Sequence, residues 1–270
     1  MNKVVKAAIC QMQVVAEKAA NLAKAGQMIH AASKQAQLVI LPEIFNAPYQ
    51  TDRLAQNAEP IPGPTTEFLA AQARENQVLL IGGSIAEINA DGIIYNTCCV
   101  FDETGKLIGR HRKLHLFDIN IPSKIVFKES DVFSAGDRLD IISHNGINFA
   151  VLICYDIRFP ELARKAALAG AQMLVVPAAF NMTTGSAHWE LLMRTRAIDN
   201  QLFVIAASPA RNPQSSYQVW GHSIAVDPWG RIISQGTTEE DIIYADLDLS
   251  LLDKVRRELP VLKNRRPELY

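Results

Sequence analysis

Cys154 is the residue of this chain whose position most strongly suggests chemistry. It follows the apolar run Val151–Ile153 and precedes the segment Tyr155–Pro160. The apolar run predicts a buried strand, and Pro160 suits the first turn of a helix that Gly170 would end. Cys154 is therefore expected at the carboxyl end of a strand, where open α/β folds bind ligands. A thiol there is a candidate nucleophile, although free cysteines are also common packing residues in protein cores.

Glu43 is a candidate general base. It directly follows the strand-like run Leu38–Pro42. A carboxylate at the end of a buried strand is partly desolvated, which raises its pKa and makes it a better proton acceptor near neutral pH. The alternative is an ordinary solvated loop glutamate.

A basic segment, Gly109–Phe117, carries three basic residues and two histidines. A charged run commonly forms a solvated face, but the apolar residues at the end of this segment indicate that one side is buried. A lysine such as Lys113, held near a thiol, stabilises the thiolate and can donate to a developing oxyanion. His111 and His115 are four residues apart but lack the adjacent glutamate of a zinc-protease motif.

The remaining cysteines, Cys10, Cys98 and Cys99, are predicted to be packing residues. Their spacing contains no C-x-x-C pair, so neither a structural zinc site nor a thioredoxin-like motif is indicated. Cys98 and Cys99 are adjacent in a strand-like stretch and should point to opposite faces of a sheet. We expect no metal site and no cofactor.

The two halves of the chain resemble each other. Three pairs of segments correspond in the same order: Ala36–Pro42 with Ala171–Pro177, Val78–Ser84 with Leu202–Ser208, and Phe101–Ile108 with Val226–Ile233. Each half therefore predicts strand, helix, strand, helix, strand and hairpin. The expected elements lie near residues 4–11, 18–34, 37–42, 65–76, 78–85, 94–101 and 106–110, and near 147–154, 160–169, 172–177, 187–199, 202–207, 220–227 and 231–235.

This alternation predicts the α/β class with mostly parallel sheets. No Gly/Ser-rich linker separates the halves, so residues 1–250 are expected to form one domain, a four-layer α-β-β-α sandwich built from two similar halves. Two separate Rossmann-like domains are the alternative, which the lack of a Gly-rich phosphate motif disfavours. Residues 251–270 lie outside the duplication and predict a short helix and an extended arm, either packed on another subunit or solvated.

The composition is that of an ordinary soluble globular protein. Of 270 residues, 49% are hydrophobic and 20% are charged, with a formal net charge of −1. This balance disfavours nucleic acid as a partner. No run reaches the roughly 18 apolar residues that a membrane-spanning helix needs, and the N-terminus lacks the apolar core of a signal peptide. We expect a cytoplasmic protein.

Together these motifs resemble the nitrilase, or carbon–nitrogen hydrolase, superfamily over about residues 4–268. That family shows a glutamate after a strand-ending proline, a lysine in a basic-hydrophobic segment, and a cysteine before Tyr-Asp-x-Arg-Phe-Pro-Glu. Glu43, Lys113 and Cys154 match these positions. The resemblance implies the α-β-β-α sandwich, a homodimer and a further catalytic-site glutamate at Glu129.

The chemistry implied by the resemblance is acyl transfer through a thioester, without a metal. Glu43 takes the thiol proton, Cys154 attacks the amide carbon, and Lys113 with a backbone N–H beside Cys154 stabilises the oxyanion. Glu43 then protonates the leaving ammonia and activates a water molecule. Glu129 would orient Lys113 and keep it protonated.

Within the superfamily, the chain is most similar to the ω-amidases. The similarity lies in Leu41–Tyr49, Lys113–Ile119, Asn181–Gly185 and His188–Leu192. The implied substrates are short α-keto acid amides such as 2-oxoglutaramate and 2-oxosuccinamate. The residues expected to bind them are Tyr49, Phe117, Tyr155, Arg158, Phe180, Asn181, Thr183 and Thr184. An amidase of deaminated glutathione, a nitrilase, and a non-catalytic binding protein on the same fold are the alternatives.

Overall fold

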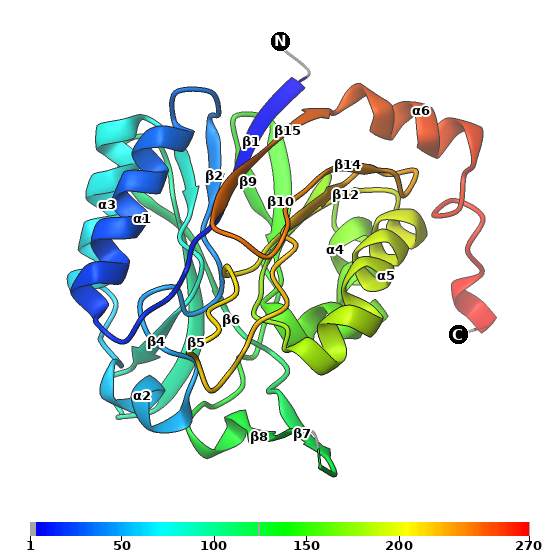
Figure 1. The fold of residues 1–270 in the computed structure, drawn as a ribbon. Coiled ribbons are helices and arrows are strands. Elements are labelled where there is room, and N and C mark those ends of the chain that lie inside the picture. The colour runs from blue at the N-terminus through cyan, green and yellow to red at the C-terminus, as the bar shows by residue number, and fades with distance from the viewer. Residues whose placement is uncertain (1–3, 124, 270) are drawn as a thin grey trace.

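The computed structural model of the protein describes residues 4–123 and 125–269. Two sheets lie face to face, with helices on the outer side of each (Figure 1). The first sheet has the strand order β15-β1-β2-β3-β5-β4, and β6 pairs with β5. Its strands are β1 (Val4–Gln11), β2 (Leu38–Ile40), β3 (Leu79–Ile81), β4 (Ile85–Ile88), β5 (Ile94–Phe101), β6 (Leu107–Arg112) and β15 (Asp241–Asp248).

The second sheet repeats the plan of the first, in the order β14-β13-β12-β11-β10-β9. In each sheet, three neighbouring strands are parallel, β1-β2-β3 and β10-β11-β12, and an antiparallel hairpin follows. The predicted duplication and the four-layer sandwich are therefore confirmed. The strands are β9 (Ile142–His144), β10 (Ile147–Val151), β11 (Met173–Pro177), β12 (Phe203–Ala207), β13 (Ile224–Val226) and β14 (Ile232–Gln235).

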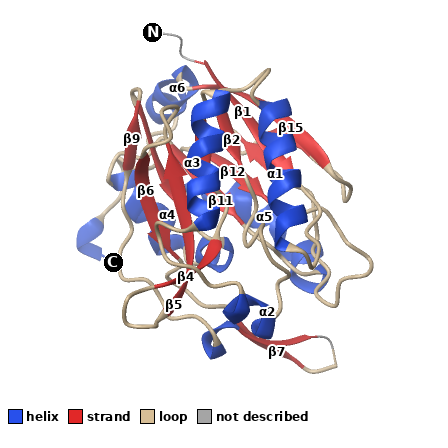
Figure 2. Cartoon of the chain, turned by 90° about the vertical axis from the view of Figure 1, so that its left-hand side faces the viewer, coloured by secondary structure: helices blue, strands red, loops and turns tan. Residues whose placement is uncertain are grey.

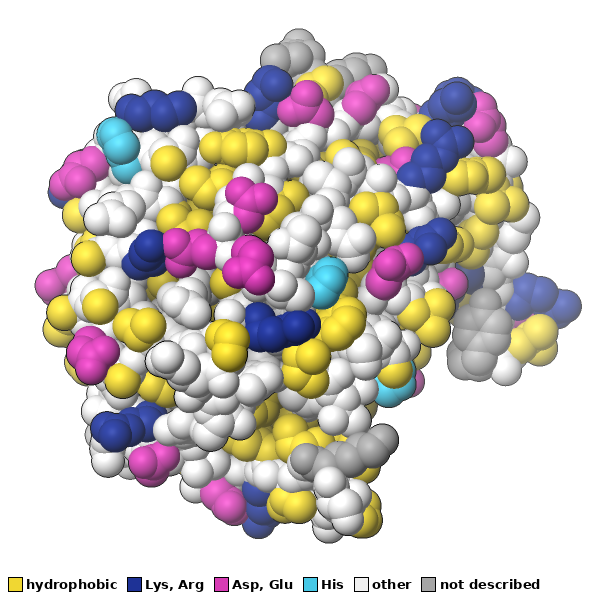
Figure 3. All heavy atoms as spheres, viewed as in Figure 1, with side chains coloured by type: hydrophobic (Ala, Val, Ile, Leu, Met, Phe, Trp, Pro, Cys, Tyr) yellow, Lys and Arg dark blue, Asp and Glu magenta, His cyan; other side chains and the backbone are white. Residues whose placement is uncertain are grey.

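Four helices form the outer layers. α1 (Lys18–Ala32) and α3 (Pro64–Asn76) cover the first sheet, as Figure 2 shows, and α4 (Pro160–Leu168) and α5 (Met182–Asn200) cover the second. α4 begins at Pro160 as predicted. No described helix is long and apolar enough to cross a membrane. On the face seen in Figure 3, basic and acidic side chains are interspersed.

Smaller elements complete the chain. The hairpin β7–β8 projects from one end of the sandwich, and α6 leads to the C-terminal arm on the side of the second sheet (Figure 1). These elements are α2 (Thr51–Gln56), β7 (Asp118–Ile121), β8 (Ile125–Lys128) and α6 (Ser250–Glu258), with 3-10 turns at Glu129–Asp131, Cys154–Arg158 and Pro267–Leu269.

Alternation along the strands builds two hydrophobic layers on the first sheet. Ile9 faces the second sheet, whereas Cys10 faces the helices. Cys98 and Cys99 divide in the same way, as predicted from their adjacency in a strand. All three cysteines are buried and unbonded, which agrees with a packing role. Burial of apolar surface between the sheets, worth about 25 cal/mol per Å², holds the two halves together.

The predicted strand at 78–85 is wrong in one respect, because it divides into β3 and β4 at Gly82-Gly83. Gly83 has φ +61°, and a Cβ atom there would lie 2.2 Å from the carbonyl oxygen of Pro42. Only glycine allows this close approach in a left-handed conformation. Ser84 then donates its amide to Pro42 at 3.3 Å and accepts from the amide of Ile44 at 3.0 Å, which fixes the residues on both sides of Glu43.

Other boundaries also differ from the prediction. α5 begins at Met182 rather than near 187, because the Asn181 side chain accepts from the Thr184 amide and caps the helix. The strand expected at 220–227 is only β13, because Gly221 and His222 have positive φ angles. β9, β15, α2 and the β7–β8 hairpin were not predicted. β15 pairs with β1 along its whole length from a part of the chain outside the duplication, so only tertiary pairing reveals it.

Candidate active site

Cys154 lies at the start of a tight turn beyond the end of β10. Two buried residues separate it from Val151, the last residue of that strand, so it lies slightly farther along than predicted. Cys154 has φ +47°, which is uncommon for a residue with a side chain and costs on the order of 1–3 kcal/mol. Strain of this kind is typical of functional turns. Cys154 itself is buried, with 5% of its surface exposed.

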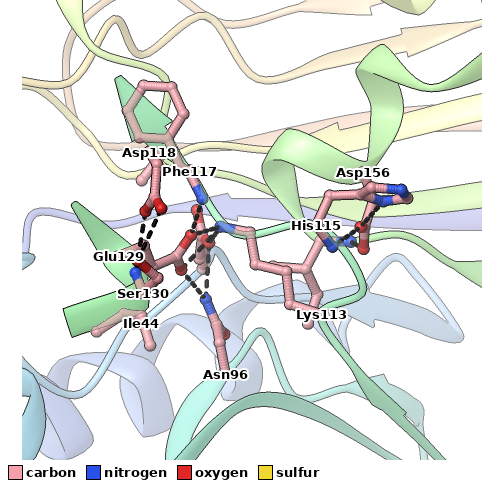
Figure 4. A network of polar contacts seen from close by, with 12 residues as sticks. Ile44, Asn96, Lys113, His115, Phe117, Asp118, Glu129, Ser130 and Asp156 are labelled. Atoms are coloured by element: carbon pink, nitrogen blue, oxygen red, sulfur yellow. Dashed lines mark hydrogen bonds and ion pairs between the residues drawn. The ribbon is translucent and has the colours of Figure 1, made fainter. Parts of the chain in front are cut away.

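Asp156 joins the Cys154 turn to the basic segment. Its carboxylate accepts from the amide of Ile153 at 3.1 Å and from the amide and Nδ1 of His115, both at 2.9 Å (Figure 4). His111 Nε2 lies 3.1 Å from the same carboxylate. Burial raises the pKa of Asp156, but the hydrogen bonds with the two histidines lower it more, to about 2. The two histidines therefore both contact Asp156, and the segment that contains Lys113 is anchored to it at each side.

Lys113 is fully buried, so the solvated-face interpretation is wrong for this residue. Its backbone amide donates to the backbone carbonyl of Asn96 at 2.8 Å. Its Nζ lies 2.9 Å from Glu43 Oε1 and 2.8 Å from Glu129 Oε2 (Figure 4). Burial lowers the pKa of Lys113, but attraction to Glu129 and Glu43 outweighs it, so the pKa lies well above its ordinary value. Lys113 is therefore a permanent cation between two carboxylates.

Glu43 is almost fully buried, with 1% of its surface exposed, which excludes the solvated loop glutamate. Its Oε1 accepts from Lys113 Nζ and Asn96 Nδ2, both at 2.9 Å, and from the Tyr49 hydroxyl at 3.2 Å. Among the described residues, its Oε2 has no hydrogen-bond partner within ordinary geometry. One oxygen is thus saturated by donors, and the other remains available to accept a proton.

The charge balance of the site favours Glu43 as a base. Burial raises the pKa of Glu43 and the Glu129 carboxylate raises it further, whereas the attraction of Lys113 lowers it; the net shift is upward. Because two carboxylates share one lysine, the second negative charge is only partly compensated. A carboxylate with a raised pKa is better matched to proton transfer near neutral pH.

The Cys154 thiol is held in its protonated form. Burial raises its pKa well above the ordinary value, the Glu43 carboxylate adds to this, and Lys113 and the backbone amide of Ala179 act in the opposite direction. A thiol in this state must pass its proton to a base such as Glu43 as it attacks.

Glu129 lies in the network where the sequence placed it. It is fully buried, and its Oε2 accepts from the Phe117 amide at 2.6 Å in addition to Lys113. Its Oε1 shares the donors of Glu43, with the Tyr49 hydroxyl at 3.0 Å and Asn96 Nδ2 at 3.2 Å. Glu129 thereby helps to fix Lys113, next to Glu43.

Arg158 lies on an aromatic surface beside the Cys154 turn. Its guanidinium carbon is 4.8 Å from the centre of the Phe180 ring and 5.7 Å from that of Tyr155. Its NH1 lies 3.1 Å from His188 Nδ1, so among the described contacts it does not pair with Asp156 or Glu161. A half-buried guanidinium on aromatic rings is a suitable receptor for a carboxylate.

The other predicted binding residues have structural contacts of their own. The Tyr49 hydroxyl bonds the two carboxylates, and the Phe117 ring packs edge-on against Tyr155 at 5.2 Å. Asn181 Oδ1 accepts from the Thr184 amide at 2.9 Å, while the buried Asn181 Nδ2 has no described partner. Thr183 is half-buried in the first turn of α5. These contacts leave substrate binding by Asn181, Thr183 and Thr184 a prediction.

No group of three or more possible metal ligands occurs within residues 4–123 and 125–269. The comparison with protein families gives the same chemistry that the site suggests: the model of the carbon–nitrogen hydrolase family matches residues 6–257. The chain belongs to the carbon–nitrogen hydrolase family. It is therefore an enzyme, and its fold agrees with that of the family.

Curated and solved relatives of this carbon–nitrogen hydrolase cover nearly its whole length. Omega-amidase NIT2 of Mus musculus is 49% identical over 264 residues, which is 97% of this chain and 95% of the relative. Omega-amidase NIT2 of Homo sapiens is 47% identical with the same coverage. The crystal structure of Saccharomyces cerevisiae Nit3, of branch 10 of the nitrilase superfamily, superposes with a TM-score of 0.90 at 42% identity, covering 97% of each chain.

Three residues of the hydrolase site were missed from sequence. Asn96 interrupts the apolar strand β5, and a buried amide in a strand is a signal that could have been noticed. Asp156 lies in the cysteine motif, but no role was predicted for it from the sequence. Tyr217 donates to the Ala179 carbonyl at 3.0 Å and packs against Tyr49 at 5.0 Å from a loop that no local pattern connects to the site.

Proposed function

We propose that this hydrolase is an ω-amidase, which cleaves the terminal amide of short α-keto acid monoamides, such as 2-oxoglutaramate and 2-oxosuccinamate, to the dicarboxylate and ammonia. The observation that carries the amidase chemistry is the buried Glu43 with one saturated and one free oxygen next to Cys154. The substrate class rests on the Omega-amidase relatives, which are 47–50% identical to the chain.

In the proposed acylation step, Glu43 Oε2 takes the proton of Cys154 as the sulfur bonds to the amide carbon. The carbonyl oxygen gains negative charge, which Lys113 and a backbone N–H beside Cys154 stabilise. Glu43 then gives its proton to the amide nitrogen, the C–N bond breaks, and ammonia leaves. Cys154 retains the acyl group as a thioester.

In the proposed deacylation step, Glu43 acts as a base a second time. It takes a proton from water as the water oxygen bonds to the thioester carbon. The C–S bond breaks, the proton returns to the sulfur, and the dicarboxylate leaves. Glu129 keeps Lys113 charged and oriented in both steps, because its two oxygens lie 2.8–2.9 Å from Nζ.

The proposed carboxylate receptor is Arg158. Its position on the Phe180 and Tyr155 rings, together with Phe117, supports a half-apolar pocket with one cationic end. The buried Asn181 Nδ2, which has no described partner, supports a second donor to the substrate. Thr183 and Thr184 remain further candidates, and Tyr49 acts through the carboxylates.

Steady-state release of ammonia from 2-oxoglutaramate, compared with deaminated glutathione and a short nitrile, tests the proposal. We expect the highest kcat/KM with 2-oxoglutaramate. Hydrolysis of the deaminated tripeptide or the nitrile without action on 2-oxoglutaramate would assign the chain to another branch of the family. A non-catalytic role on this fold is not supported, because Glu43, Lys113 and Cys154 are all present and joined in one network.

We also propose that residues 1–250 form one domain and that the C-terminal arm, residues 251–270, packs on a second subunit of a cytoplasmic homodimer without a nucleic-acid partner. Two apolar residues of the arm, Leu259 and Leu269, are 47% and 64% exposed, which supports burial by a partner. Light scattering of the whole chain and of Leu269→Glu tests this. We expect a dimer that the substitution weakens, and a monomeric whole chain would contradict it.

A further inference from the structure

A small cavity borders Glu43 on the side of Tyr49 and Tyr217. Its volume is about 40 Å³, and its inner wall includes Glu43, Tyr49 and Tyr217. Its half-buried wall residues include Asn212 and Ser215, here called the mouth, and neither Cys154 nor Arg158 belongs to the described wall. The cavity therefore joins the base to the surface through the loop that follows β12.

The size of this cavity selects its occupant. A water molecule needs roughly 10–15 Å³ of such space, so about 40 Å³ holds a few waters. Pockets for small organic ligands measure roughly 300–1,000 Å³. A five-carbon α-keto acid amide does not fit, and no arginine or lysine among the wall residues would neutralise its carboxylate.

The wall chemistry also suits water. The inner end combines the Glu43 carboxylate, whose Oε2 has no described hydrogen-bond partner, with the hydroxyls of Tyr49 and Tyr217. The mouth residues are already hydrogen-bonded, because Asn212 Nδ2 donates to the Val14 carbonyl at 3.3 Å and the Ser215 hydroxyl donates to the Tyr217 carbonyl at 3.0 Å. Residues such as Ala47 and Val219 make the sides of the cavity apolar, so a water molecule forms no hydrogen bonds with these side chains. Ordered waters need two to four polar partners, which the end at Glu43, Tyr49 and Tyr217 supplies.

We propose that this cavity supplies the hydrolytic water of the reaction. The inference rests on the thioester mechanism proposed above. After ammonia leaves, the acyl group occupies the side of Cys154 next to Arg158. A water from the cavity gives one proton to Glu43 while its oxygen bonds to the thioester carbon, the C–S bond breaks, and the proton passes from Glu43 to the sulfur. The base thus contacts its two proton donors, thiol and water, from different sides.

Filling the cavity should separate the two half-reactions. Ala210→Val adds two methyl groups to the buried wall, and Asn212→Leu replaces the polar residue at the half-buried mouth. In a rapid-quench experiment with 2-oxoglutaramate, we expect a first equivalent of ammonia at the wild-type rate. Later turnover should then slow about tenfold, and the thioester should accumulate in acid-quenched protein by mass spectrometry.

Asn89→Leu is the matched control. Asn89 Oδ1 accepts from two backbone amides of its own turn at 3.0 and 2.8 Å, and Asn212 Oδ1 accepts from the Gln214 amide at 3.0 Å. Asn212 Nδ2 also donates to the Val14 carbonyl at 3.3 Å, and Asn89 does not line the cavity. We expect no accumulation of thioester in this control. If Ala210→Val fails to fold, Asn212→Leu carries the test, because its side chain lies at the surface.

Two results would overturn the inference while leaving the mechanism in place. A slower first equivalent of ammonia or a raised KM would make the cavity part of the substrate path, and unchanged rates in both variants would show that water arrives elsewhere. Continued ammonia release by Cys154→Ala would instead overturn the thioester mechanism itself, and the water inference with it.

Discussion

The side-chain amide of Asn96 lies 2.9 Å from Glu43 Oε1, the same oxygen that Lys113 and Tyr49 contact. Three donors on one oxygen leave Oε2 as the basic atom and fix which way the carboxylate faces. The backbone carbonyl of Asn96 also accepts from the backbone amide of Lys113 at 2.8 Å. One residue of β5 thus positions both the base and the cation.

Replacement of Asn96 by leucine should raise the pKa of Glu43. A hydrogen bond to a carboxylate stabilises its charged form, so removal of that donor favours the protonated acid. We expect the acidic limb of the kcat/KM profile, which reports the base in the free enzyme, to move to higher pH, with a loss of about tenfold to a hundredfold in kcat. The measurement is the pH dependence of ammonia release.

Thr97→Val serves as the control for Asn96→Leu. Thr97 is the next residue of the same buried strand, and its hydroxyl donates to Glu87 at 2.6 Å rather than to the catalytic carboxylates. It should lower stability without moving the pH profile. An unshifted pH profile in Asn96→Leu would show that Asn96 stabilises the fold but does not affect the pKa of Glu43.

Substitution of Glu43 by glutamine tests whether the thiol needs a base. The amide fits the same space but cannot accept the thiol proton, and the pKa of Cys154 lies well above its ordinary value. We expect turnover to fall by about a factor of 10²–10⁴. Because the Glu43 charge raises the pKa of Cys154, its loss should not slow alkylation of Cys154 by iodoacetamide at pH 7. Cys154→Ala should abolish both turnover and alkylation at this position with the fold intact.

Normal rates in Glu43→Gln would remove it as the base. If alkylation instead slowed in parallel with turnover, Glu43 would be needed to form the thiolate as well as to handle ammonia and water. The two measurements together therefore separate the roles of Glu43.

The layers of this fold were predictable from sequence because the strand-helix alternation occurs twice and each buried strand is a continuous apolar run. β15 was not, because its pairing with β1 joins positions at least 230 residues apart, such as Val4 with Asp248. At the site, Glu43 and Cys154 follow strand ends and can be found by position. Asn96 depends on a side-chain direction within a strand, and no local pattern reveals that it faces two carboxylates.

Asp156→Asn should remove a pH-dependent part of the stability. The pKa of Asp156 falls from 3.8 to about 2 in the folded protein. A lowered carboxyl pKa contributes stability that is present above the unfolded value, near pH 4, and is lost as pH falls toward 2. The shift corresponds to about 2 kcal/mol of unfolding free energy. At pH 7 we expect the variant to be less stable than wild type by about this amount. The free energy of unfolding of the variant should then change little as the pH falls, because the titrating carboxylate is absent.

Urea unfolding of wild type and Asp156→Asn at pH 7 and pH 2.5 measures this difference. The matched control is Asp246→Asn, because Asp246 forms an exposed ion pair with Lys6 at 3.2 Å, which contributes little. The stability gap between wild type and Asp156→Asn should narrow at pH 2.5. A gap that stays constant with pH would mean that the carboxylate charge does not stabilise the turn.

Arg158→Leu should separate substrate recognition from catalysis. The leucine keeps an apolar contact with Phe180 and Tyr155 but removes the guanidinium that lies on their rings. Charge-assisted hydrogen bonds contribute about 1.5–3 kcal/mol, so KM for 2-oxoglutaramate should rise by about tenfold to a hundredfold. A neutral amide of the same length has no carboxylate for Arg158 to bind, so its kcat/KM should change little.

His188→Ala is the control for Arg158→Leu, because it removes the neighbour that lies 3.1 Å from the guanidinium and leaves the charge in place. We expect a smaller rise in KM than in Arg158→Leu. Equal losses of kcat/KM for the neutral and the anionic amide in Arg158→Leu would instead mean that Arg158 supports the Cys154 turn. The carboxylate would then have to be bound by another donor, and Asn181 Nδ2 is the first candidate because it is buried without a described partner.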